Sequence, residues 1–334
     1  MSDSSRARAR TWPYPRHREF EKELRKVASA WFSDKGFAVS TRYPYILADR
    51  EKWSQNIILP KVAQYIREEH ARRESQRQGF PLHRYIHHGL SSQAMIFNLV
   101  GPLIVAQDLD PLRQAFTRQG TAWPEGEVSA SFEYKDRSVF NEDTGQPTSI
   151  DLVLKDGSGQ PRLFVEGKLV EKEFGGCSVF ERGDCDGRNP APDFSLCYLH
   201  HLGRRYWELL DKHGFLAGVI GQNATCILAS YYQFFREVIF ALELGGSFVL
   251  LSDERNPTFS CDGPQGKRGL MPFLLSLVPQ SLHTYIATVS IQQMVAAIKS
   301  SGRHGWIAEF ERKYGLNQET SNATISQIEI PAKP

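Results

Sequence analysis

The chain has 334 residues, of which 41% are hydrophobic and 23% charged, and its net charge is only +2. This length allows one large domain or two ordinary ones, and the composition is typical of a globular protein rather than a disordered or fibrous one. No stretch is apolar enough over sufficient length to span a bilayer, and the small net charge does not by itself indicate a nucleic-acid-binding protein.

The start of the chain is polar and rich in arginine, without the apolar segment of a signal peptide. We therefore expect an intracellular, cytoplasmic protein. The five cysteines are irregularly spaced, which does not indicate a secreted disulfide framework. Residues 6–26 and 66–88 are locally basic, and solvated helical faces are the simpler explanation for both segments.

Apolar periodicity predicts helices in the first third of the chain. Residues 18–37 have helical spacing, and a second helix is expected from about Pro60. Residues 94–105 are apolar nearly all round, with Ser91 or Ser92 as the N-cap. This third helix should therefore be buried.

Strand patterns follow. Residues 127–136 alternate between apolar and polar side chains, and Phe132 and Tyr134 are expected on the same buried face. The segments TSIDLVL and LFVEGKLV read as two strands joined by a glycine-rich turn. Helices are expected at 194–214 and 226–246, with a final buried strand from residue 247 and a mostly helical remainder.

The turn between the two strands determines which residues face each other. If it centres between Ser158 and Gly159, Asp151 lies directly across from Glu166, with Cβ atoms about 5 Å apart. Lys168 shares the face of Glu166 by the period-two rule. The opposite face is then aliphatic apart from Gly167, and it should pack on the helix at 94–105. Its members are Ile150, Leu152, Leu154, Leu163, Val165, Gly167 and Leu169.

Two carboxylates at this distance repel each other, and each raises the pKa of the other unless a cation lies between them. Asp151 and Glu166 are therefore candidate ligands of Mg²⁺ or Mn²⁺, with the backbone carbonyl of Gly167 as a further ligand. Lys168 would orient or help deprotonate an attacking water, or offset charge on a pentacovalent phosphate. The alternative is that Glu166 and Lys168 form a surface ion pair on an edge strand.

These two segments together resemble the PD-(D/E)xK nuclease superfamily, in which an Asp on one strand and Glu-x-Lys on the next form the active site. The resemblance implies an α/β fold with a restriction-endonuclease-like αβββαβ sandwich core and a short mixed central sheet. It assigns metal binding to Asp151 and Glu166 and a catalytic role to Lys168. One departure is that Ile150 stands where the motif has Pro.

The resemblance covers about residues 90–255. Residues 1–89 would form an N-terminal helical, partly basic extension and residues 256–316 a C-terminal helical extension, so that extra helices lie at both ends. Residues 317–334 would form a weakly ordered tail.

The implied function is a Mg²⁺-dependent deoxyribonuclease that hydrolyses DNA, with a role in prokaryotic restriction, defence or repair. Two alternatives stay open: a catalytically degenerate nuclease fold that binds nucleic acid without cutting it, and a metal-dependent ribonuclease. The expected partner is DNA, with RNA not excluded, and a homodimer is one option for the assembly.

Further residues are candidates around this centre. The resemblance suggests that Gln93 on the first core helix completes the metal site, with Asn98 as the alternative and simple helix capping as the competing explanation. Glu133 is either an extra metal ligand or part of a solvated face. Gln233 and Arg236 are candidates only through their expected proximity in this fold.

The segment HHLGRRYWELL combines guanidinium groups with aromatic rings. Such a mixture suits phosphate contact and base stacking, so Arg204 and Arg205 are candidate nucleic-acid contacts. One helix cannot direct the whole set to the same side, and Tyr206 and Trp207 are expected in the core.

Cys177, Cys185 and Cys197 follow the proposed site closely, although their spacing is not that of a zinc ribbon or finger. They are either free thiols in a loop or ligands of a structural zinc or iron–sulfur cluster. In the second case Cys226, Cys261, or one of two histidines would supply the fourth ligand. These histidines are His200 and His201.

Overall fold

The computed structural model describes residues 16–145, 147–263 and 266–317. Residues 1–15, which hold much of the basic segment at 6–26, lie outside the described residues, as does the expected tail after residue 317. Across the described ranges, no helix combines the length and apolar character needed to cross a membrane.

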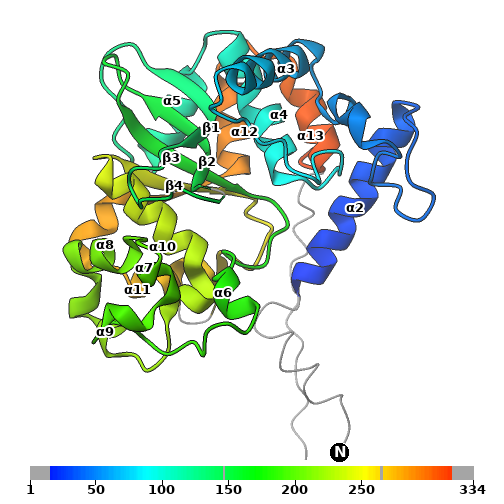
Figure 1. Cartoon of the computed structure of the whole chain (residues 1–334). Coiled ribbons are helices and arrows are strands. Elements are labelled where there is room, and N and C mark those ends of the chain that lie inside the picture. The colour runs from blue at the N-terminus through cyan, green and yellow to red at the C-terminus, as the bar shows by residue number, and fades with distance from the viewer. Residues whose placement is uncertain (1–15, 146, 264–265, 318–334) are drawn as a thin grey trace, which may run out of the picture.

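A five-stranded mixed sheet forms the centre of the protein, in the order β1-β2-β3-β4-β7 (Figure 1). Its strands are β1 (Ser129–Lys135), β2 (Ser149–Lys155), β3 (Pro161–Lys168), β4 (Ser247–Ser252) and β7 (Ile286–Ser290). β1, β2 and β3 are antiparallel neighbours, whereas β3, β4 and β7 run parallel. The expected αβββαβ order is therefore present. β4 was expected to be the last strand, but β7 adds one more from a segment predicted to be mostly helical. A short hairpin, β5 (Cys261–Gly263) with β6 (Gly266–Arg268), lies outside this sheet.

Helices from both ends of the chain lie on one side of the sheet, with α2 packed on α13 rather than on the strands (Figure 1). They are α2 (Arg16–Asp34), η1 (Arg50–Asn56), α3 (Pro60–Ser75), α4 (Ser92–Val105), α5 (Asp110–Arg118), α12 (Ile291–Ser300) and α13 (Ile307–Tyr314). Their buried side chains and one face of the sheet form a single hydrophobic cluster, which we call the α4-side cluster. It includes Met95, Ile96 and Leu99 of α4.

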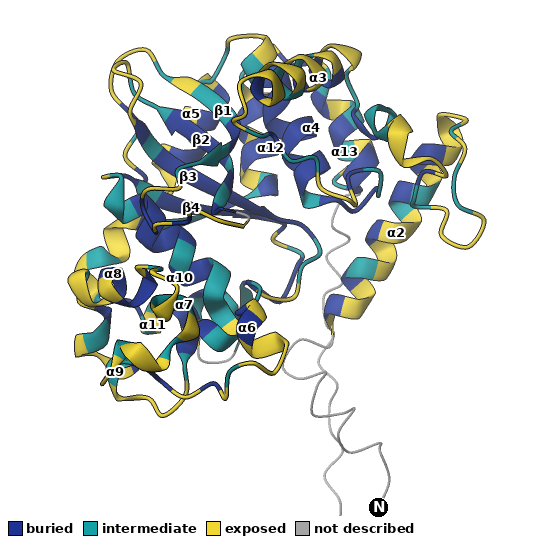
Figure 2. Ribbon diagram, in the orientation of Figure 1, coloured by how far each residue is buried: buried dark blue, intermediate teal, exposed yellow. Residues whose placement is uncertain are grey.

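Shorter helices and one long helix cover the other face. They are α6 (Ser178–Glu181), η2 (Phe194–Leu196), α7 (Tyr198–His201), α8 (Tyr206–Lys212), η3 (Phe215–Ala217), α9 (Val219–Gln222), α10 (Ile227–Glu243), α11 (Leu270–Ser276) and η4 (Gln280–Tyr285). The core on this side, the α10-side cluster, includes Phe234 and Val238. Figure 2 shows the sheet and α4 as the most buried layer, between two layers with exposed outer surfaces.

The predicted buried helix is α4. The Ser91 hydroxyl caps it by accepting a hydrogen bond from the amide of Ala94 at 3.3 Å, and every residue from Gln93 to Leu103 is buried. Gly101 lets α3 come close, because a Cβ at that position would lie only 2.5 Å from Cγ1 of Val62. The absence of a polar stripe on α4 is thus explained by packing on all sides.

The helix expected at 194–214 is interrupted. The chain forms η2 and α7, then turns before α8. Gly203 has φ +80, a left-handed conformation that glycine adopts without strain, and it ends the first helical piece. Tyr206 and Trp207 in α8 are 4% and 1% exposed, which confirms their prediction as core residues.

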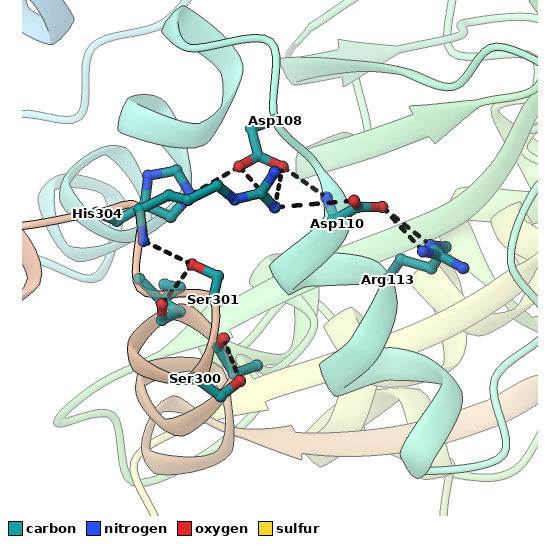
Figure 3. Close-up of polar contacts among 9 residues, drawn as sticks. Asp108, Asp110, Arg113, Ser300, Ser301 and His304 are labelled. Atoms are coloured by element: carbon teal, nitrogen blue, oxygen red, sulfur yellow. Dashed lines mark hydrogen bonds and ion pairs between the residues drawn. The ribbon is translucent and has the colours of Figure 1, made fainter.

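Polar contacts attach the C-terminal helices to the body of the protein (Figure 3). The carboxylate of Asp108 lies 2.9 Å from Nε2 of the buried His304, and Nη2 of Arg303 lies 3.1 Å from Asp108 Oδ1. On α5, Asp110 accepts a hydrogen bond from Arg113 Nη2 at 2.9 Å. These contacts fix the loop between α12 and α13 against the segment that follows α4.

Asn98 of α4 joins the N-terminal and C-terminal segments. Its Oδ1 accepts the amide of Ile58 at 2.7 Å, and its Nδ2 donates to Asn56 O at 3.0 Å and to the hydroxyl of Tyr314 at 3.1 Å. Asn98 was the alternative to Gln93 as a metal-site residue, but both ends of its amide are used in these structural contacts.

Candidate active site

The hairpin of β2 and β3 has the predicted register. Leu152 pairs with Val165, Val153 with Phe164 and Leu154 with Leu163. The described ladder ends at Leu152 and Val165, one step before Asp151 and Glu166. Beyond that point, Asp151 Oδ2 accepts the amide of Gly167 at 2.9 Å. A side chain therefore continues the contact between strands where backbone pairing ends.

The sequence predicted that apolar side chains two residues apart on β1 and β2 would share one face of the sheet, and this regular alternation breaks at the same place. Phe132 lies in the α4-side cluster but Tyr134 packs against the α10-side cluster, and Ile150 and Leu152 are divided in the same way. Between them, Glu133 has φ +53, an uncommon backbone conformation for a residue with a side chain. Ile150 was thus wrongly assigned to the aliphatic face, because β1 and β2 both change face at the level of Glu133. Such local strain is often found at functional sites.

Three carboxylates meet at this irregularity. Burial, followed by the charges of Glu166 and Glu133, raises the pKa of Asp151 well above its usual range. Burial also raises the pKa of Glu133, with the charge of Glu166 adding to the effect. The mutual repulsion expected of Asp151 and Glu166 is therefore present, and Glu133 takes part in it.

Gln93 positions Glu133 rather than presenting a free oxygen. Its Oε1 accepts the amide of His83 at 2.8 Å, and its Nε2 donates to Glu133 Oε1 at 2.6 Å and to Pro81 O at 2.9 Å. The second oxygen of Glu133 accepts a hydrogen bond from Ser149 at 2.8 Å. The Gln93 oxygen already accepts one hydrogen bond, so its role in a metal site stays a prediction, and Glu133 is held in place from both sides.

Lys168 and Glu166 form a buried pair, only 6% and 4% exposed. Lys168 Nζ donates to Glu166 Oε1 at 2.8 Å and to Gln233 Oε1 at 2.9 Å, while Gln233 Nε2 donates to Glu166 Oε1 at 2.7 Å. Burial alone would lower the pKa of Lys168, but the negative charges of Glu166, Glu171 and Glu237 outweigh it and raise that pKa. Lys168 is accordingly an ammonium group, which donates hydrogen bonds and does not accept a proton. The alternative of a surface ion pair is excluded by the burial.

A kink in α10 accompanies the placement of Gln233. The amide of Gln233 donates to Gly175 O at 3.3 Å, and Ala229 O, its usual partner in a helix, accepts the amide of Cys177 at 3.2 Å. The loop after β3 is thus inserted into the hydrogen-bond ladder of α10. Tyr231, which lies between Ala229 and Gln233 in the chain, has non-helical angles, φ −131 and ψ 34. This insertion accounts for the kink.

Glu237 was not identified from the sequence. It lies one helical turn beyond Gln233, is fully buried, and accepts a hydrogen bond from Gln233 Nε2 at 2.8 Å. Burial and the charge of Glu166 raise its pKa well above the usual range, and its Oε2 has no hydrogen-bond partner among the described residues. The sequence did contain a signal for it: Glu237 follows Gln233 by four residues, which puts both on the same, otherwise apolar, face of the helix.

The donor set fits a hard divalent cation. Within the described part of the chain, the hydrogen bonds to Glu166 reach Oε1 and the bond to Asp151 reaches Oδ2, which leaves one oxygen of each carboxylate available. A cation there would relieve the repulsion that raises the pKa of Asp151. Among residues 16–145, 147–263 and 266–317, no three His, Cys, Asp or Glu side chains form a ready-made metal site, so these two carboxylates would need ligands of another kind as well.

Arg204 and Arg205 have partners of their own. Arg204 donates to Asn141 O and, at 2.9 Å, to Thr144 O, and Arg205 Nε lies 3.4 Å from Glu208 Oε2 on the same helix. The guanidinium group of Arg204 thus fixes the loop after β1. In the described structure, neither arginine is hydrogen-bonded to the carboxylate cluster.

The cysteines are free, and those described do not assemble into a metal site. Cys177 precedes α6, and Cys197 lies between η2 and α7. Burial raises the pKa of Cys197, and it raises that of Cys226 to about 12. The zinc or iron–sulfur alternative, for Cys185 as for the others, stays a prediction for which the described residues supply no ready-made ligand set.

A family model described as "Restriction Endonuclease associating with ARP" matches residues 25–315. No curated protein and no solved structure matches the chain. The match confirms the expected restriction-endonuclease-like fold and indicates a nuclease-type function with a nucleic acid as substrate. It extends over most of the chain, including the helices on both sides of the sheet. The chain therefore belongs to the family of restriction endonucleases associating with ARP.

Proposed function

We propose that the protein is a Mg²⁺- or Mn²⁺-dependent nuclease that hydrolyses phosphodiester bonds of DNA, with Asp151, Glu166 and Lys168 as its catalytic residues. One observation carries this proposal. At the end of the β2–β3 hairpin, two carboxylates with available oxygens lie beside a buried ammonium group. A purely structural core has little reason to bury these charges together.

Asp151 and Glu166 would hold the cation, with the Gly167 carbonyl as a further ligand. A bound divalent cation supplies charge neutralisation and an acidified water at a phosphodiester. The residues of the chain do the rest. Lys168 donates to a non-bridging oxygen of the phosphate and offsets its growing negative charge, a role for which its raised pKa suits it.

Gln233 and Glu237 are positioning residues in this proposal. Gln233 bridges Lys168 and Glu166 and thereby fixes both side chains. Glu237 accepts a hydrogen bond from Gln233 Nε2 at 2.8 Å and so holds the Gln233 side chain against Lys168 and Glu166.

The test is cleavage of linear, circular and single-stranded DNA and of RNA by the whole chain with Mg²⁺ or Mn²⁺. Asp151→Asn, Glu166→Gln and Lys168→Met should each lower the rate at least about 10²-fold. Lys155→Met is a matched control, because Lys155 lies at the opposite end of the same hairpin and contacts the ring of Tyr134.

Absence of cleavage by the wild type under all these conditions would refute catalysis. Binding of nucleic acid without cleavage would instead support the degenerate module, and cleavage of RNA alone would support the ribonuclease alternative. Equal rates for Lys168→Met and Lys155→Met would remove Lys168 from the mechanism.

A further inference from the structure

A second feature is connected to the carboxylate cluster through shared hydrogen bonds. A pocket of about 260 Å³ opens between α2, the loop at 83–92 and the segment after β3. Its lining includes Arg25, Tyr45, His83, Tyr85, His88 and Glu171. This volume is slightly below the range of about 300–1,000 Å³ typical of small-molecule sites, so the pocket suits one small planar group.

The pocket shares its structural support with the catalytic residues. The amide of His83 donates to Gln93 Oε1 at 2.8 Å, and Gln93 in turn holds Glu133. On the other side, the amide of Leu169, next to Lys168, donates to Glu171 Oε2 at 2.6 Å. A strand that passes the carboxylates would therefore pass this pocket too.

Aromatic rings and a guanidinium group gather around Tyr85. The ring of Tyr85 is 40% exposed, and its centre lies 5.2 Å from that of His83 and 4.9 Å from that of His88. Cζ of Arg84 lies 4.4 Å from the centre of the Tyr85 ring. Among the other lining residues, Cζ of Arg25 lies 5.1 Å from the ring centre of Tyr45. Such a combination of rings and guanidinium groups binds bases by stacking.

The loop that carries these rings is fixed before any ligand arrives. Asn56 Nδ2 donates to Ile86 O at 2.8 Å and to His88 O at 2.7 Å, and the amide of Gly89 donates to Tyr45 O at 2.8 Å. Binding would therefore cost little conformational entropy, because the loop is already ordered.

The charges inside the pocket favour a neutral group over a phosphate. The carboxylates of Glu21 and Glu171 are part of its lining and would repel a phosphate. Burial lowers the pKa of His83 and lowers that of His88 to about 4, so both imidazoles are uncharged at neutral pH. Uncharged imidazoles both donate and accept hydrogen bonds, as the edge of a base requires.

We propose that this pocket receives one unpaired base of the substrate strand, stacked on Tyr85, next to the phosphodiester at Asp151 and Glu166. This inference rests on the proposed function, because it takes the carboxylate cluster as the site of cleavage. It adds a preference for single-stranded or locally opened nucleic acid, since a base inside a continuous duplex is stacked and paired and cannot enter.

Binding can be measured apart from cleavage. We would use the whole chain with Asp151→Asn as background, and follow the fluorescence anisotropy of a labelled single-stranded oligonucleotide and of the same sequence as a blunt duplex. Tyr85→Ala should weaken binding of the single strand about 5- to 150-fold, the range expected for one stacked base. Tyr85→Trp should retain binding of the single strand, and neither substitution should change binding of the duplex.

Tyr43→Ala is the matched control. Tyr43 is also 40% exposed and lies under a guanidinium group, with Arg42 Cζ 5.2 Å from its ring centre, but it does not line the pocket. Its substitution should leave binding of both oligonucleotides unchanged. Thermal unfolding of each variant would show that the fold is retained, as expected for two exposed side chains.

Equal binding of the single strand by the Tyr85→Ala and Tyr43→Ala variants would overturn the proposal, as would an equal loss for single strand and duplex. Neither result would contradict the proposed nuclease activity, which is measured separately on the wild type. Conversely, a specific loss with Tyr85→Ala in a protein whose wild type cuts nothing would support the base pocket and refute the proposed catalysis.

Discussion

Replacing Gly167 by alanine tests how β3 packs on α4. A Cβ at this position would lie 2.1 Å from Cδ1 and 2.7 Å from Cγ1 of Ile96. Carbon atoms in good contact are about 3.5–4.0 Å apart, so Ile96 or the strand would have to move by more than about 1 Å. Ile96 is 1% exposed and enclosed in the α4-side cluster, which leaves it little room. We expect Gly167→Ala to lower the free energy of unfolding by about 1–3 kcal/mol.

The cause can be isolated with a double-mutant cycle in urea unfolding. Ile96→Ala alone should cost about 2–5 kcal/mol, because it leaves a cavity in the core. In the double variant the new methyl group enters that cavity. The combined loss should therefore be smaller than the sum of the single losses by about 1 kcal/mol or more.

A surface glycine provides the control. A Cβ on Gly305 would have no other atom within 4 Å, so Gly305→Ala should change stability by less than about 0.5 kcal/mol. Additive effects of the substitutions at Gly167 and Ile96, within about 0.5 kcal/mol, would refute the direct contact on which the reasoning rests.

Two further predictions concern stability. Burial opposes ionisation of Glu309, but hydrogen bonds from Lys35 and Arg312 lower its pKa to about 2. A depressed pKa stabilises the fold above the ordinary value of 4.5, and this contribution is lost as pH falls toward 2. Glu309→Gln should thus cost about 1–2 kcal/mol at pH 7, and this cost should shrink steadily below pH 4.5 and nearly vanish at pH 2; an equal cost in urea unfolding at pH 7 and pH 2 would contradict this. Tyr206→Phe removes a hydrogen bond of 2.7 Å to the buried carboxylate of Glu142, and it should cost about 1.5–3 kcal/mol in the same assay. A loss below about 0.5 kcal/mol would show that water or another donor replaces the hydroxyl.

The hairpin could be predicted because its information is local. Alternation with period two and a glycine-rich turn select one register, and a shift by one residue would turn the aliphatic residues of one strand away from those of the other. The structure has that register, with Leu152 paired to Val165. The grouping of Asp151, Glu166 and Lys168 followed from it. The burial of α4 was also visible, since its sequence has no polar face.

The surroundings of the site could not be predicted in this way. Glu133 takes a left-handed backbone conformation that its strand-like sequence does not indicate, and this conformation changes the faces of the residues beside it. The sequence did not indicate that the amide of Gln93 is hydrogen-bonded to both His83 and Glu133. Each of these outcomes depends on a neighbour from another element.

The sequence by itself determined the buried helix, the hairpin and the grouping of the candidate residues on it, because periodicity and turn composition act over a few residues. Only the tertiary structure decided how those residues are held. The loop after β3 enters the ladder of α10 and accompanies a kink there, and α10 places Gln233 and Glu237 beside Lys168. These contacts join positions more than fifty residues apart, where chain connectivity gives no indication of proximity and the packing of the whole core selects the partners.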